Sequence, residues 1–104
     1  MDQSLDDARR NRNTSGRVPP HELAAEASLL GAMMLKQDAI AAAAEVRLTA
    51  ADFYKPSHGH IFDAIESLYH RGDPADIITV ADELTRDGLL EACGGKPYLI
   101  ELQA

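Results

Sequence analysis

The chain contains fragments of two motifs that would support chemistry, and neither fragment is complete. Lys96 follows Gly95, as in the phosphate-binding loop G-x-x-x-x-G-K-[ST]. That loop also needs Gly where Leu90 stands and Ser or Thr where Pro97 stands. The segment His21–Ala25 begins like the zinc motif H-E-x-x-H but lacks its second histidine, so one metal ligand is missing. We therefore expect neither a P-loop nor a zinc site of this kind.

The other residues with reactive side chains stand in spacings that favour packing or solvation. His58 and His60 are two positions apart, so a helix would direct them to different sides. Cys93 is the only cysteine, and a nucleophilic cysteine needs a base that the neighbouring sequence does not supply. The pair Asp82–Glu83 is typical of a solvated helix face. We predict no catalytic, cofactor-binding or metal-binding residue in the chain.

Tyr98 is the aromatic residue best suited to bind a partner. The other four aromatic residues lie in a tight turn or on an apolar stripe and are expected to be buried, namely Phe53, Tyr54, Phe62 and Tyr69. Tyr98 follows the turn Gly94–Pro97, which allows its hydroxyl to reach the surface, and its amphipathic ring suits an interface. The alternative is a half-buried tyrosine of the core, and the sequence leaves both open.

The elements that must position these residues all have helical periodicity. After Pro20, apolar residues recur at Leu23, Ala27, Leu30 and Met34, which is one face of a helix. Gly31 in the middle of this helix indicates the close approach of another helix, since Gly otherwise costs about 1 kcal/mol relative to Ala. Asp38 is expected to cap a second helix, rich in alanine, over residues 39–46.

Turn and cap residues divide the rest of the chain into short helices. Thr49 and Asp52 have the form of a capping box, and the strongest apolar stripe, over residues 57–71, ends at Gly72. Asp76 is the expected cap of the next helix, although Thr79 offers a competing start. The last helix, with Pro97 in its first turn, has no residue that would end it before Ala104, so we expect it to be truncated.

No segment alternates as a half-buried strand does, so the sequence predicts an all-α fold, a compact bundle of five or six short helices. A length of 104 residues suits one small domain. Residues 1–18 carry four Arg, three Asp and no apolar periodicity, and we expect them to form a flexible polar tail. The helical domain is then residues 19–104.

The charge is strongly acidic, with 17 Asp and Glu against 10 Lys and Arg and a net charge of −7. Residues 19–104 carry −8, because residues 1–18 contribute +1. An acidic surface repels phosphate, so we expect no tight DNA binding. The chain has no apolar run of membrane-spanning length, no start typical of a signal peptide, and no second cysteine for a disulfide, which favours a cytoplasmic setting without membrane attachment.

Several stretches together resemble the amino-terminal domain of DnaB-type replicative DNA helicases. They occur in the same order as in that family and cover residues 18–104: Val18–His21 with Glu26 and Leu30–Gly31, Asp52–Tyr54, His58 with His60–Phe62, Asp76 with Ile78–Val80, and Gly94–Gly95 with Tyr98–Leu99. One departure is Ala24–Ala27, where the family often has Glu-Ala-Glu-Gln, so no partner contact is carried over there.

The resemblance implies a collar and docking domain without catalytic activity. In this family the domain supports a ring-shaped hexamer and binds the carboxy-terminal domain of primase, and sometimes a loader protein. ATP, Mg²⁺ and the DNA-gripping loops belong to a separate motor domain of an ATP-dependent helicase. The resemblance makes Tyr98 a candidate primase contact. The family continues into a helical hairpin that this chain lacks, so we expect the chain alone to be mainly monomeric.

A different class of protein is the alternative. Helix-turn-helix proteins also join short helices through turns that contain Gly, so a free-standing helical adaptor or DNA-binding regulator is the competing hypothesis. The candidate helices carry Asp63, Glu66, Asp82 and Glu83 where a recognition helix needs Lys or Arg, which argues against DNA.

Overall fold

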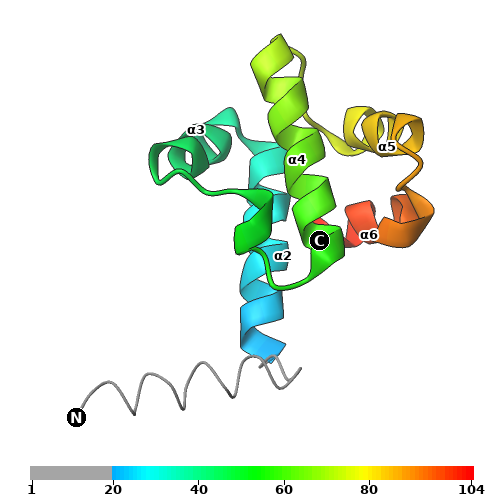
Figure 1. Ribbon diagram of the computed structural model, residues 1–104, viewed down its shortest axis with the longest axis horizontal. Helices are drawn as coiled ribbons and strands as arrows, with labels where there is room; N and C mark the ends of the chain where they lie inside the picture. The colour runs from blue at the N-terminus through cyan, green and yellow to red at the C-terminus, as the bar shows by residue number, and fades with distance from the viewer. Residues whose placement is uncertain (1–19) are drawn as a thin grey trace.

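The computed structural model describes residues 20–104, and within them the fold is all-α, as predicted (Figure 1). These residues form five α-helices and two single 3₁₀ turns, in the order α2 (Pro20–Leu35), α3 (Gln37–Glu45), η1 (Ala50–Asp52), α4 (Pro56–Arg71), α5 (Ile77–Arg86), η2 (Glu91–Cys93) and α6 (Gly95–Leu102). The predicted tail, residues 1–18, lies outside the described residues. No helix in the described part is long and apolar enough to cross a membrane.

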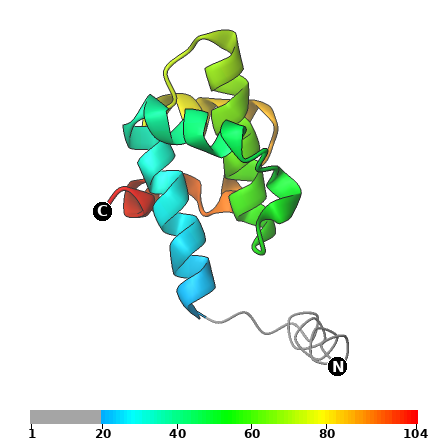
Figure 2. The ribbon, with the colours of Figure 1, turned by 90° about the vertical axis from the view of Figure 1, so that its left-hand side faces the viewer.

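Helices α2 and α4 form the centre of the bundle and pack side by side in both views (Figures 1 and 2). Helix α3 and the turn η1 pack on one side of this pair, while α5, η2 and α6 lie on the other side (Figure 1). Helix α6 contacts both α5 and α2, so the end of the described chain closes back onto α2. This closure brings residues near position 98 to the part of the chain near position 26.

The core fills the space between these helices with aliphatic side chains and one aromatic pair. Phe62 of α4 is 0% exposed, and its ring centroid lies 5.1 Å from that of Phe53. Every helix from α2 to α6 supplies buried apolar residues, among them Leu30, Met33, Ile40, Ile61, Ile65, Val80, Leu84 and Leu99. The stripe predicted on residues 57–71 is therefore the core face of α4.

Most local signals act as the sequence predicts. The backbone N–H of Thr49 donates to Asp52 Oδ2 at 2.8 Å, as expected for the capping box. Gly72 ends α4 in the left-handed region, with φ of 82°. Asp76 caps α5, and Thr79 is its partner in a second capping box rather than a competing start, because the Thr79 N–H donates to Asp76 Oδ1 at 2.9 Å.

Two predicted helix boundaries are wrong. Helix α3 begins at Gln37 with Lys36 at the cap position, so Asp38 lies in the first turn rather than at the cap. The Lys36 N–H still bonds to the α2 carbonyl of Ala32, which leaves a single residue between the two helices. Helix α6 ends at Leu102 instead of continuing to Ala104, because the last two amides bond to carbonyls three residues back and tighten the final turn.

Gly31 in α2 marks the close approach of another helix, as predicted, and the structure shows that this helix is α6. A Cβ on Gly31 would lie 2.1 Å from the carbonyl oxygen of Leu102. Only a residue without a side chain allows the two backbones to approach so closely. Gly31 therefore fixes where α6 sits on α2.

A set of ion pairs joins α4 to α5. Glu83 Oε1 lies 2.9 Å from Nη2 of Arg71 and 2.6 Å from Nη2 of Arg86, and Arg71 also pairs with Asp73. These guanidinium groups lower the pKa of Glu83 below its ordinary value near 4.5. Glu83 is only 9% exposed, so the predicted solvated pair Asp82–Glu83 is half wrong: Asp82 faces solvent and Glu83 is buried against arginine.

Candidate docking site

Tyr98 lies one turn into α6 and is half-buried. The turn before it is set by Gly94, whose φ of 95° is a left-handed conformation that a side chain would strain. A Cβ on Gly94 would also lie 2.7 Å from the Cβ of Tyr98, so the glycine backbone packs directly against this tyrosine. The Gly-Gly turn noted in the sequence thus holds the base of the Tyr98 side chain.

The Tyr98 hydroxyl lies against His58, which α4 places in the interior. His58 is 1% exposed, and its Nε2 is 2.5 Å from the Tyr98 hydroxyl oxygen. The two rings are nearly parallel, at 13°, with centroids 5.9 Å apart. Tyr98 therefore contacts His58 through a hydrogen bond between two nearly parallel rings.

Glu26 of α2 binds the other nitrogen of the same histidine. Glu26 Oε1 is 2.8 Å from Nδ1 of His58, and Glu26 Oε2 accepts a hydrogen bond of 2.5 Å from the backbone N–H of Tyr54. The Lys55 N–H lies 3.4 Å from Oε1. Burial raises the pKa of Glu26, but the hydrogen bonds from His58 and the two backbone amides outweigh it, so the net pKa is below 4.5.

An ionised Glu26 assigns the roles of the two ring nitrogens of His58. A carboxylate only accepts hydrogen bonds, so Nδ1 of His58 donates to it. In a neutral imidazole the second nitrogen then accepts, which leaves the Tyr98 O–H as the donor to Nε2. Burial and the nearby carboxylates of Glu101 and Glu26 raise the pKa of Tyr98 above 10, so this proton stays on the phenol. We call the three residues the Glu26–His58–Tyr98 relay.

A cation completes the surroundings of Tyr98. Lys55 Nζ lies 4.8 Å from the centroid of the Tyr98 ring, a distance typical of a cation–π contact. Lys55 is itself exposed and sits at the cap position of α4, immediately before the turn that carries His58. Tyr98 thus has packed neighbours from the start of α4 as well as from its own turn.

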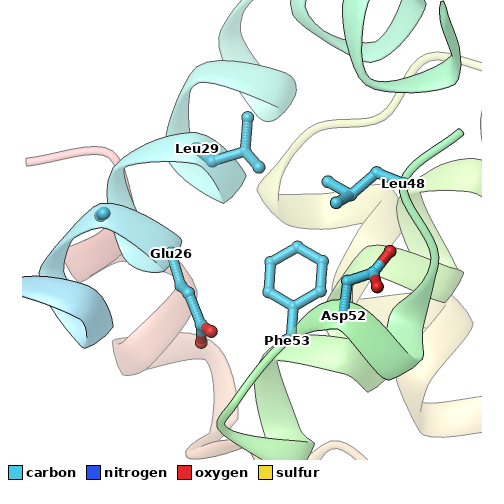
Figure 3. Close-up of a pocket in the computed structure, with 6 residues that line it drawn as sticks. Glu26, Leu29, Leu48, Asp52 and Phe53 are labelled. Carbon is cyan, nitrogen blue, oxygen red and sulfur yellow. The ribbon is translucent and has the colours of Figure 1, made fainter. Parts of the chain in front are cut away.

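An apolar groove lies beside the relay and shares Glu26 with it (Figure 3). It has a volume of about 190 Å³ and lies between α2 and η1. The side chains of Leu29, Leu48 and Phe53 converge on it, while the carboxylates of Glu26 and Asp52 stand on either side of the Phe53 ring (Figure 3).

The structure places the other candidate residues apart from the relay or inside the core. His60 is exposed while His58 is buried, so the two histidines point to different sides as predicted. Cys93 is buried, its thiol lies 3.6 Å from the Ser57 carbonyl oxygen, and burial raises its pKa. Among residues 20–104 no three His, Cys, Asp or Glu side chains are grouped so as to hold a metal ion.

One aromatic prediction is wrong, and one is only partly met. Tyr54 is 36% exposed, because Phe53 before it has extended backbone and takes the core position, and neighbours on extended backbone point to opposite sides. Tyr69 is half-buried at the end of the α4 stripe. Phe53 and Phe62 are buried as predicted.

The fold and this site define the class of protein as a small all-α domain. Its buried histidine, His58, is bonded at both ring nitrogens to other side chains of the domain. Residues 18–104 match the family described as "DnaB-like helicase N terminal domain", and the chain belongs to this family. The match favours the helicase hypothesis over the adaptor or DNA-binding regulator.

Replicative helicases are similar to this chain over most of its length. The chain is 58% identical over 84 residues to "Replicative DNA helicase DnaB" of Mycobacterium leprae, a match that covers 81% of this chain and 14% of that protein. It is 43% identical over 86 residues to "Replicative DNA helicase DnaC" of Bacillus subtilis, which covers 83% of this chain and 19% of that protein. The chain thus spans less than a fifth of the length of these curated relatives.

A solved structure has the same fold. The crystal structure of the N-terminal domain of DnaB helicase from Mycobacterium tuberculosis matches with a TM-score of 0.75 and 57% sequence identity. The match covers 78% of this chain and 57% of that chain.

The sequence predicts Tyr98 as a candidate contact residue but not its bonds to Glu26 and His58. It indicates for Glu26 a charge near a helix start and a place in the family resemblance, and for His58 packing or solvation. The signal that could have found them is chemical: a histidine and a glutamate on separate apolar helices each need a polar partner once buried.

Proposed function

We propose that this chain is the collar and docking domain of a replicative DNA helicase, which supports assembly of a ring-shaped hexamer and binds primase. The observation that carries the proposal is the match of residues 18–104 to the helicase amino-terminal domain, with 58% identity to a replicative helicase. The parent protein unwinds DNA in the cytoplasm, and its partners are other copies of itself, primase and, in some systems, a loader.

Docking involves Tyr98. A half-buried tyrosine with a fixed ring suits an interface, because it adds contact area and loses little conformational freedom on binding. The partner is the carboxy-terminal domain of primase. Support for this assignment is the agreement between the family resemblance at Gly94–Leu99 and the position of Tyr98 at the surface end of the relay.

Catalysis belongs to another part of the helicase, and this domain binds no cofactor. ATP and Mg²⁺ act in the motor domain of the parent. The support is that the side chains here with the most reactive chemistry are already engaged: both nitrogens of His58 are bonded within the domain, and the Cys93 thiol is buried. The charge of −8 on residues 19–104 disfavours a phosphate backbone as ligand.

Titration of the chain with the primase carboxy-terminal domain tests the docking role. Wild type is expected to bind, and Tyr98→Ala to weaken binding by about 5- to 30-fold, as for an interface aromatic worth about 1 to 2 kcal/mol. Ile100→Ala is the matched control, because Ile100 is 57% exposed on the same helix and faces away from Tyr98. Its affinity is expected to equal that of wild type.

Circular dichroism on the same samples separates a lost contact from a loosened fold. Because Tyr98 also binds the buried His58, Tyr98→Ala is expected to keep its helical content but to melt at a lower temperature, so affinities are compared at a temperature at which both chains are folded. Unchanged affinity with an intact fold would remove Tyr98 from the docking surface, and a wild-type chain that does not bind would overturn primase docking by this domain.

A further inference from the structure

The Tyr98 side chain is restrained from three directions. The Gly94 backbone packs against its Cβ, the ammonium group of Lys55 lies 4.8 Å from its ring centroid, and Nε2 of His58 binds its hydroxyl at 2.5 Å. Of these restraints, only the bond to His58 acts on the far end of the side chain. The orientation of the ring therefore depends on how firmly His58 is held.

His58 is held by Glu26, which is itself anchored from outside the relay. The second carboxylate oxygen of Glu26 accepts the backbone N–H of Tyr54 at 2.5 Å, so the carboxylate cannot turn without breaking a bond to the main chain. With 1% exposure, His58 has no room for another rotamer in solvent. A main-chain amide, a carboxylate and an imidazole thus form a continuous chain of hydrogen bonds that ends at the Tyr98 hydroxyl.

We propose that His58, fixed by Glu26, is a positioning residue for docking at Tyr98, and that the tyrosine hydroxyl serves this inward bond rather than a contact with the partner. The inference rests on the docking role proposed above. With Nδ1 of His58 donating to Glu26, a neutral imidazole accepts the Tyr98 O–H at Nε2, and that proton is then not available to a partner acceptor. The partner meets the exposed part of an aromatic ring whose direction is set from the interior.

A double-mutant cycle on the 104-residue chain tests this dependence. Tyr98→Phe removes the hydroxyl and keeps the ring. His58→Asn keeps a donor near the position of Nδ1, for the bond to Glu26, but is too short to reach Tyr98. Each variant is expected to weaken binding of the primase carboxy-terminal domain by about 3- to 10-fold, because a Tyr98 ring released from His58 must be ordered when the partner binds. The double variant is expected to bind no more weakly than either single variant, because both remove the same bond.

The exposed histidine of the same helix provides the control. His60→Asn makes the same chemical change two positions away, where the side chain faces solvent, and is expected to leave affinity unchanged. Additive losses in the cycle would overturn the inference, because they would mean that the hydroxyl acts on the partner independently of His58. A His58→Asn chain that binds the primase carboxy-terminal domain as tightly as wild type would also overturn the inference.

A spectroscopic measurement on the unmodified chain keeps the inference testable if His58→Asn fails to fold. The relay requires the Nδ1–H tautomer of His58, with Nε2 as acceptor, and ¹⁵N NMR of the imidazole distinguishes the two tautomers. An Nε2–H tautomer would overturn the relay even if primase binds normally. A wild-type chain with the expected tautomer but no affinity for primase would instead overturn the proposed docking function, and with it the role of the relay in docking.

Discussion

Gly31→Ala provides the sharpest test of how α6 is placed on α2. In the interior of an ordinary helix this change stabilises by about 1 kcal/mol, because Ala is the better helix former. Here the added Cβ would lie 2.1 Å from the Leu102 carbonyl oxygen, where Cβ atoms do not approach closer than 3.0 Å. The end of α6 must therefore move by about 1 Å.

The loss from this movement exceeds the gain in helix propensity. Overpacking of this kind costs about 1 to 3 kcal/mol. The upper part of that range applies, because the obstacle is a backbone carbonyl, which cannot rotate away as a flexible side chain would. After about 1 kcal/mol of helix propensity is subtracted, Gly31→Ala is expected to lower the free energy of unfolding by about 2 kcal/mol.

Urea denaturation followed by circular dichroism measures this difference. Ser28→Ala, on the exposed side of the same helix, is the control and is expected to change stability by less than about 0.5 kcal/mol. A Gly31→Ala chain as stable as wild type, or more stable, would refute the reasoning, because α6 would then not rest on α2 at this glycine.

Three further predictions concern the core, the ion pairs and the absence of catalysis. Phe62→Ala, at a side chain with 0% exposure, is expected to lower the free energy of unfolding by about 3 to 5 kcal/mol in chemical denaturation, and a loss below about 1 kcal/mol would place Phe62 outside the core. Because the pKa of Glu83 is lowered by Arg71, its stabilising effect is present above pH 4.5 and is lost as the pH falls through the lowered value. Glu83→Gln should therefore destabilise at pH 7, and the difference from wild type should shrink in urea titrations at decreasing pH, whereas the exposed neighbour Asp82→Asn should show a smaller and flatter difference. The chain alone is expected neither to hydrolyse ATP nor to bind single-stranded DNA tightly, and ATP turnover that co-elutes with the folded chain would contradict this.

The sequence predicts well those features that depend on residues close together in the chain. The cap at Asp76 needs only a backbone amide three positions on, and the stop at Gly72 needs only the freedom of one residue to adopt positive φ. The helical stripes follow from a period of three to four residues. Gly31 was also predictable as a helix contact, since its cost in a helix requires a compensating approach, although nothing in the sequence identified α6 as the partner.

The relay could not be predicted, because its bonds join distant parts of the chain. Glu26 and His58 are 32 residues apart, and His58 and Tyr98 are 40 apart. Whether such side chains meet depends on the rotation and register of three packed helices, which core packing sets. The wrong prediction for Tyr54 has a related cause, because only the direction of the chain after η1 decides which of two adjacent aromatic residues enters the core.

The packing of α6 on α2 and the orientation of the Tyr98 ring both depend on where α6 lies relative to α2. Tyr98 and Leu102 are four residues apart on α6, so they lie on the same side of the helix, about 6 Å from each other along its axis. Leu102 rests on α2 through Gly31, and Tyr98 is connected to α2 through His58 and Glu26. A displacement of about 1 Å at the contact between Gly31 and Leu102 is large compared with the range of donor–acceptor distances that a hydrogen bond allows. The 2.5 Å bond between His58 and Tyr98 would therefore be disturbed. Gly31 is therefore coupled to the direction of the Tyr98 ring, and under the proposed docking role of Tyr98, Gly31→Ala is expected to weaken docking as well as folding.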